Sequence, residues 1–105
     1  MKVQNMTGRT GRPVANQFII TDTERNKETE HEWKTETFQS YDSIIAKISY
    51  GIDDYNSTRM YVYLDSTYWD YSRTTGKYRN EFLGENKAET QRKIDSGEYI
   101  LTNLN

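Results

Sequence analysis

The stretch from Tyr68 to Gly84 combines aromatic rings and cations in a pattern that suits the binding of nucleic acid. It reads YWDYSRTTGKYRNEFLG and holds three tyrosines, one tryptophan, one phenylalanine and three cations. Rings that stack on bases, next to cations that contact phosphates, are the usual means of gripping a single strand. Cations four residues apart would share a helix face and could straddle a phosphate. The candidate residues for this chemistry are Arg73, Lys77 and Arg79, joined by Arg9 and Arg12 on a glycine-bearing loop.

The same stretch also has a structural interpretation, in which its rings form the core of a small domain. The chain has nine tyrosines and three phenylalanines, so many rings must bury one face and keep the hydroxyl wet or hydrogen-bonded. The rings and apolar side chains that we expect in the core are Trp69, Tyr78, Phe82 and Leu83. The three cations of the stretch, Arg79 included, are then expected to point outward.

A second group of candidates is acidic and suits the binding of a protein. If residues 22–36 form a hairpin, the even-numbered glutamates from Glu28 to Glu36 line one face, with a spacing of about 6–7 Å that a two-residue strand step sets. Such a ladder could occupy an arginine-lined groove meant for nucleic acid, while tyrosine rings supply desolvated contacts. The alternative is a charged edge strand that resists aggregation. The candidate partner-binding residues are Asp22, Glu24, Glu28, Glu30, Glu32, Glu36, Tyr61, Tyr63, Tyr68 and Tyr71.

The sequence offers little for catalysis or for metal binding. It has no cysteine and a single histidine, His31, which excludes thiolate zinc sites and two-histidine metal motifs. Adjacent strand residues point to opposite faces, so Asp53 and Asp54 do not share a substrate unless the loop bends sharply. Asp65 and Asp70 could build a magnesium or hydrolase site, but turn-forming and capping roles are favoured. We therefore expect no enzyme, no cofactor and no metal.

Charge is distributed unevenly along the 105 residues. Residues 1–21 carry three cations and no acid, residues 22–58 carry nine acids and four cations, and residues 59–105 carry seven of each. The net charge of −2 argues against a general nucleic-acid binder, which is usually strongly cationic. The sequence lacks an apolar run long enough to span a bilayer, and its first residues do not resemble a signal peptide. A cytoplasmic protein without a membrane partner is the expectation.

Side-chain periodicity predicts strands in the first two-thirds of the chain. Residues 59–65 alternate so that Met60, Val62 and Leu64 face one way and Tyr61 and Tyr63 the other. Residues 31–41 alternate as well, up to a bulge or a change of face expected near Thr37. The expected strands are residues 2–6, 14–21, 31–41, 43–50 and 59–65, with a loop or an extended hairpin tip at 22–30 and a loop at 51–58.

The pattern in the last third of the sequence predicts two short helices and a final strand. Ser72 or Thr74 can cap the first helix, which Gly84 ends, and Asn86 can cap a second helix that Gly97 ends. The buried stripe of the second helix would be Ala88, Gln91 and Ile94, and residues 98–104 close the chain as a strand. This order predicts a single α+β domain over residues 1–105, an antiparallel sheet of about five to six strands with two helices on one face.

Three segments resemble a known group of proteins. They read FQSYDSIIAKI, YWDYSRTTGKYRNEFLG and IDSGEYILTNLN, and they are similar to small proteins of bacteriophages and mobile elements, mostly of Gram-positive hosts. The resemblance covers residues 1–20 and 38–105. It implies a phage or mobile-element context, in which small accessory proteins act stoichiometrically on host machinery. In size and surface the chain also looks like an anti-CRISPR inhibitor, a likeness of role and not of motif.

These observations lead to two function hypotheses from different classes. The first is an inhibitor that binds a host defence nuclease, with a Cas9-type effector as the leading target, because such enzymes hold nucleic acid in positively charged channels. The alternative is a small nucleic-acid-binding accessory protein that uses residues 68–79. In either case we expect a monomer or a small homo-oligomer.

Overall fold

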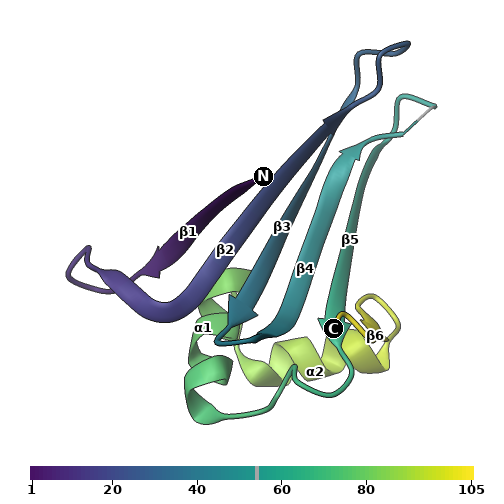
Figure 1. Cartoon of the computed structure of the whole chain (residues 1–105). Coiled ribbons are helices and arrows are strands. Elements are labelled where there is room, and N and C mark those ends of the chain that lie inside the picture. The colour runs from purple at the N-terminus through teal and green to yellow at the C-terminus, as the bar shows by residue number, and fades with distance from the viewer. Residues whose placement is uncertain (54) are drawn as a thin grey trace.

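The computed structural model of the chain describes residues 1–53 and 55–105. It shows a six-stranded sheet and two helices near the C-terminus (Figure 1). The expected α+β fold class is therefore confirmed. The elements are β1 (Lys2–Thr7), β2 (Pro13–Arg25), β3 (Glu32–Ser40), β4 (Ser43–Ile52), β5 (Thr58–Asp65), α1 (Arg73–Leu83), α2 (Lys87–Asp95) and β6 (Ile100–Thr102).

The strands lie in the sheet in chain order. Each of the first four pairings is antiparallel between consecutive strands, as expected of hairpins. The pairing of β5 with β6 is parallel, and α1 and α2 form the crossover between these two strands. The strand boundaries lie within two residues of expectation, except at the end of β2. Strand β2 continues to Arg25 because β3 pairs with it as far as Glu32, so the segment 22–30 begins as an extended hairpin, one of its two expected forms. Strand β6 spans only Ile100–Thr102.

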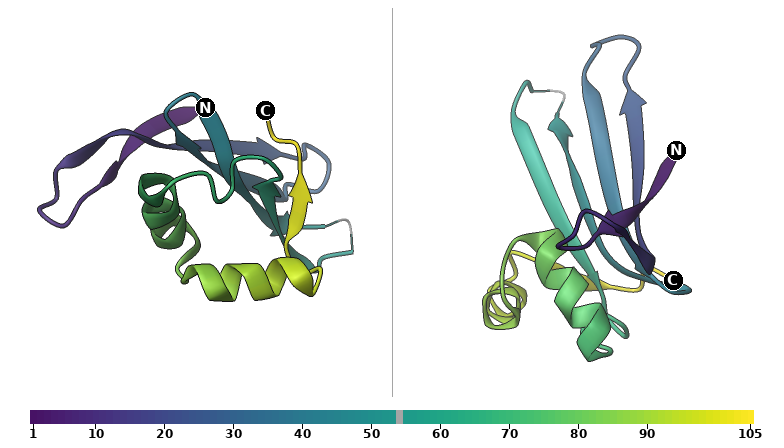
Figure 2. Two further views of the ribbon diagram at one scale, coloured as in Figure 1. Left: turned by 90° about the horizontal axis from the view of Figure 1, so that it is seen from below. Right: turned by 90° about the vertical axis from the view of Figure 1, so that its left-hand side faces the viewer.

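Both helices pack on one face of the sheet, near the end where β3 turns into β4 (Figure 2). We call this face the inner face. Its core residues are Ala46, Val62 and Leu64, which pack with Tyr99 from the loop before β6. Trp69, Phe82, Leu83 and Ile94 pack against this cluster, which confirms the expected core roles of the first three. Phe38 is fully buried and lies 5.8 Å, ring to ring, from Phe82.

The other side of the sheet, the outer face, carries the alternate residues of each strand. One row across it runs Val3, Ile20, Thr37, Lys47, Tyr63 and Ile100 through successive pairings. The register of β4 with β5 confirms that Tyr61 and Tyr63 lie on the face opposite Met60 and Leu64. The predicted bulge is confirmed one residue later than expected, as a register shift between Phe38 and Gln39.

The helix termini follow from their capping residues. The Ser72 side chain accepts a hydrogen bond from the Thr75 amide, which settles the choice between Ser72 and Thr74. Gly84 closes α1 with a φ of 70°, a left-handed conformation that costs glycine little. Asn86 and Glu89 form a reciprocal capping box at the start of α2.

The predicted buried stripe of α2 is largely wrong. Ala88 and Gln91 are exposed, and Thr90 is the fully buried residue of this helix. Thr90 turns inward because its hydroxyl donates to the buried carboxylate of Glu85, 2.5 Å away. Among the described residues, no helix is long and apolar enough to cross a membrane.

Candidate functional site

Five cations gather around one hollow of about 650 Å³ beside α1. Two acids, Asp70 and Glu81, share its lining, so cations exceed acids by three. We call this site the basic hollow. It contains four of the five cations proposed for nucleic acid, and only Arg12 is absent from its wall. The five cations are Arg9, Arg73, Lys77, Arg79 and Lys87.

Three separate segments supply these cations. Arg73 and Lys77 share a face of α1 because they are four residues apart. Arg9 reaches the hollow from the turn between β1 and β2, where Gly8 and Gly11 are joined by a backbone hydrogen bond and Gly11 has a φ of 77°. Lys87 is the first residue of α2. Sequence reasoning missed Lys87, and its position just after a helix cap gives no chemical signal that would have indicated it.

Arg79 lies inside the protein, so the expectation that it points outward is wrong. Its side chain is only 1% exposed. One terminal nitrogen donates to the Trp69 carbonyl at 2.6 Å, and the other donates to the Asn80 side chain at 3.0 Å. The guanidinium also lies 5.2 Å from the centre of the Trp69 ring. Arg79 thus fixes the wall of the hollow, and its buried Nε has no hydrogen-bond partner among the described residues.

Asp70 neutralises part of the positive charge. Its carboxylate lies 2.6 Å from the Lys87 ammonium and 3.4 Å from the Arg79 guanidinium. The hydrogen bond from Lys87 is the main reason that the pKa of Asp70 is lowered. Within residues 1–53 and 55–105, no carboxylate forms an ion pair with Arg9, Arg73 or Lys77, so these three charges are the ones available to a ligand.

The N-terminus of α1 adds to the positive potential of the hollow. The first amides of any helix have no partner inside it, and they carry the positive end of the helix dipole. Ser72 and Arg73, the cap and the first residue of α1, both line the hollow. The first turn of α1 contains no acid that would cancel the dipole. An anion at this position would meet amides and cations together.

Aromatic rings lie close to the basic hollow in the sequence. Tyr71 stands between Asp70 and Ser72, which both line it. The Tyr71 ring meets the Tyr68 ring edge to face, with centroids 5.6 Å apart. The Lys77 ammonium lies 5.2 Å from the centre of the Tyr78 ring. Cations and rings are therefore interleaved along this segment, as the sequence predicted.

The predicted ladder of acids is wrong. Strand β3 begins at Glu32, so Glu28 and Glu30 lie in the turn between β2 and β3, where Glu30 has a φ of 61°. Glu36 shares the inner face with Glu32 but is already engaged, since it accepts a hydrogen bond from Tyr50 at 3.2 Å and lies 3.6 Å from the Lys34 ammonium.

The remaining acids of the set lie on the opposite face. Asp22 and Glu24 pair with Thr35 and Trp33 on the outer face. Their separation from Glu32 and Glu36 follows from the twofold period of a strand, because odd and even positions of paired strands alternate between faces. The acids therefore form no continuous ladder.

The four candidate tyrosines are divided between two places. Tyr61 and Tyr63 lie on the outer face, and the Tyr61 ring is 6.2 Å from the ring of Trp33. Tyr68 and Tyr71 lie just before α1. The structure thus places two of the candidate tyrosines on the outer face and the other two in the segment that leads into α1.

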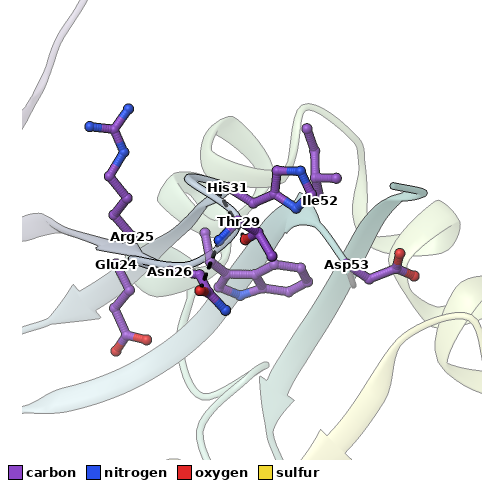
Figure 3. A pocket seen from close by; sticks show the side chains of 8 residues that line it. Glu24, Arg25, Asn26, Thr29, His31, Ile52 and Asp53 are labelled. Carbon is purple, nitrogen blue, oxygen red and sulfur yellow. Dashed lines mark hydrogen bonds between the residues drawn. The ribbon is translucent and has the colours of Figure 1, made fainter. Parts of the chain in front are cut away.

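A smaller hollow of about 380 Å³ lies between the hairpin tips. His31 and Thr29 line it from the β2–β3 turn, and Ile52 and Asp53 line it from the end of β4 (Figure 3). The His31 Nδ1 atom is buried there without a hydrogen-bond partner among the described residues. Asp53 bonds to Arg59 at 2.8 Å, and the neighbouring candidate Asp54 lies outside the described residues.

Asp65 has the turn-forming role that the sequence favoured. Its carboxylate accepts hydrogen bonds from the amides of Thr67, Tyr68 and Leu104 at 2.7–3.0 Å. All three bonds hold the backbone around the end of β5 in place, and the Asp65 side chain is buried. Within the described residues, no group of three or more histidines, cysteines, aspartates or glutamates could hold a metal ion.

Comparison with known proteins places the chain in one family. Among curated proteins and solved structures, none matches it. The sequence profile of a family of unknown function matches residues 1–98, which is nearly the whole chain. The protein therefore belongs to the family of unknown function DUF8033.

Proposed function

We propose that this protein binds nucleic acid by holding the sugar–phosphate backbone in the basic hollow. The observation that carries the proposal is the convergence of Arg9, Arg73 and Lys77, free of carboxylate partners among the described residues, on the N-terminus of α1. Phosphate contacts from lysine, arginine and helix amides supply most of the affinity of such complexes. The hollow offers all three kinds of contact.

The charge distribution supports a local site on a protein with a negative total charge. The β2–β3 tip, residues 22–32, carries five acids and two cations and lies at the end of the sheet opposite the helices (Figure 1). A polyanion is therefore repelled from one end of the molecule and attracted to the other. Such a dipole orients an approaching strand even when the total charge is −2.

The test compares two double variants that remove the same charge. Arg73→Ala with Lys77→Ala takes two cations from the basic hollow, and Arg25→Ala with Lys27→Ala takes two from the β2–β3 tip. Fluorescence anisotropy with a labelled single strand, measured over a range of salt, gives the affinity and its salt slope. We expect the first variant to weaken binding and to reduce the slope of log K against log salt by about 1.4. Equal losses in both variants, or no binding by the unchanged protein, would contradict the proposal.

A second candidate function is inhibition of a host defence nuclease, and the outer face is the observation that favours it. Tyr61 is exposed there beside Trp33, and large rings of this kind dominate protein–protein hot spots. Titration into a purified Cas9-type nuclease tests it. We expect the unchanged protein and a Tyr55→Asp control to block cleavage at a one-to-one ratio, and Tyr61→Asp to lose the block. Undiminished cleavage with the unchanged protein would exclude this target.

A further inference from the structure

We infer that the ligand of the basic hollow is a single-stranded nucleic acid, with a phosphate over the first turn of α1 and a base stacked on Tyr71. This inference rests on the proposed function and adds the class of nucleic acid to it. It combines two features of the structure, the anion site and the exposed ring of Tyr71, whose two neighbours in the chain, Asp70 and Ser72, both line the hollow.

The anion site consists of more than the N-terminus of α1. Arg79 forms part of the wall with a side chain that is almost wholly buried, and its Nε lacks a partner among the described residues. Gly76 also lines the hollow, and a Cβ at this position would lie 3.6 Å from the Arg79 guanidinium. Because Gly76 has no side chain, little protein separates the buried Arg79 guanidinium from the hollow at this point. A phosphate would meet Arg73 and Lys77 directly, over a wall made electropositive by Arg79.

Tyr71 has the properties of a stacking ring. Its side chain is 62% exposed although it lies one residue before the cap of α1. Its ring contacts the Tyr68 ring edge to face, at an interplanar angle of 83°, which limits the freedom of the side chain. An exposed ring that is already restricted loses less side-chain entropy when a base stacks on it. The surface that binds phosphate and the surface that stacks a base are thus separated along the chain by Ser72 alone.

This arrangement discriminates between single strands and duplexes. The bases of a duplex are paired and stacked on each other, so a ring outside the helix cannot reach their faces without unstacking them. A single strand presents a free base beside each phosphate, and stacking on an aromatic side chain tolerates any base. The ring therefore contributes to the binding of a single strand only.

The experiment measures dissociation constants at one fixed salt concentration with three probes. These are an oligothymidine, a duplex of the same length, and an abasic backbone of the same length. We expect Tyr71→Ala to weaken the oligothymidine about 5- to 150-fold, the loss of one stacked base, and to leave the abasic and duplex probes unchanged. Tyr71→Phe keeps the ring and should retain affinity. Tyr55→Ala removes a tyrosine that is 88% exposed in the β4–β5 turn, far from α1, and serves as the matched control.

The outcomes separate this inference from the proposed function. If Arg73→Ala with Lys77→Ala weakens every probe but Tyr71→Ala weakens none, phosphate binding stands and base stacking is overturned. If Tyr71→Ala weakens the abasic probe as much as the oligothymidine, the ring supports the fold and does not stack a base. If no probe binds the unchanged protein, the proposed function is overturned, and the single-strand inference with it.

Discussion

Single side chains with several partners hold the C-terminal third of the chain together. Glu85 is the clearest case, because its carboxylate is only 4% exposed and receives three donors. Tyr99 donates at 2.6 Å, Lys93 at 2.8 Å and Thr90 at 2.5 Å. These donors come from α2 and from the loop before β6, so one carboxylate ties the second helix to the last strand.

The first prediction concerns this carboxylate. Glu85→Gln keeps the shape but removes the charge and one acceptor, which leaves Lys93 without its counter-ion. We expect the free energy of unfolding to fall by about 2 kcal/mol, the usual cost of losing a hydrogen-bonded charge. Urea denaturation followed by circular dichroism measures the change. The exposed Glu98→Gln is the control and should change the stability little; an equal effect of both variants would show that the network carries no special stability.

The second prediction is a pH dependence of stability at its acidic limit. Burial raises the pKa of Asp65 and of Glu85, but hydrogen bonds outweigh it, from the Leu104 amide in one case and the Lys93 ammonium in the other, so both pKa values are lowered. A carboxyl with a lowered pKa in the folded chain holds protons less tightly there than in the unfolded chain. Its stabilisation is therefore complete above the ordinary pKa of about 4 and is lost as the pH falls further.

At alkaline pH the dependence has the opposite sign, because stability falls as the pH rises. Burial, followed by the hydrogen bond to Glu85, raises the pKa of Tyr99 to about 12. This stabilisation is complete below pH 10, the ordinary pKa of tyrosine, and is lost as the pH rises toward 12. Urea midpoints measured from pH 2 to pH 12 should thus form a plateau with a fall at each side. A stability that rises below pH 4 would contradict the assigned pKa directions.

At the scale of elements, the sheet depends on a close approach between β3 and β4. The Trp33 ring lies over Gly51, and a Cβ at that position would lie 2.4 Å from the ring and 2.6 Å from the Glu32 carbonyl. The third prediction follows, because the Glu32 carbonyl belongs to the backbone and cannot move without shifting the start of β3. We expect Gly51→Ala to cost about 1–3 kcal/mol of folding stability, measured by thermal unfolding. Gly97→Ala is not a suitable control because the φ of Gly97 is 81°. Ala15→Gly is the control, because it exchanges alanine and glycine at an exposed position of β2.

Much of this element structure could be predicted from the sequence, for local reasons. The alternation in β5 and the caps Ser72, Gly84 and Asn86 depend on neighbours within a few residues, and all of them were correct. The features that stayed open or were predicted wrongly depend on residues that are distant in the sequence. Strand β2 extends through a polar segment because β3 pairs with it, and Thr90 turns inward because Glu85 lies below it.

In the candidate site, too, local features could be predicted and features that depend on distant residues could not. Residue types identified Arg73 and Lys77, and helical spacing placed them together. The burial of Arg79 could not be predicted, because it depends on the Trp69 carbonyl and on the Trp69 ring beneath the guanidinium. The ladder of acids failed because it assumed strand geometry through Glu28 and Glu30, where the chain turns.

At the scale of the whole molecule, the shape is elongated. The extents are 43 × 33 × 24 Å and the radius of gyration is 14.5 Å, compared with about 13 Å for a compact domain of this length. The helices cover one end of the inner face, and the hairpins extend beyond them (Figure 1). The fourth prediction is a gradient of local stability along the sheet.

Amide hydrogen exchange measures this gradient. Residues near the covered end, such as Ala46 and Leu64, are fully buried and should exchange only on global unfolding. Thr23 and Glu24 lie near the β2–β3 tip, are exposed, and should exchange earlier through local fraying. Uniform protection along β2 would show that the tips are held by interactions other than the sheet.

The parallel pairing of β5 with β6 has a consequence for the order of assembly. The β-hairpins need only contacts between neighbours in the sequence, so they can form fast. Strand β6 can pair only after α1 and α2 have brought the chain back, and the Asn105 side chain then bonds to the Ile44 backbone across 61 residues. Closing such a long loop costs entropy before any contact repays it. We therefore expect the final strand to dock late in folding, after the hairpins have formed.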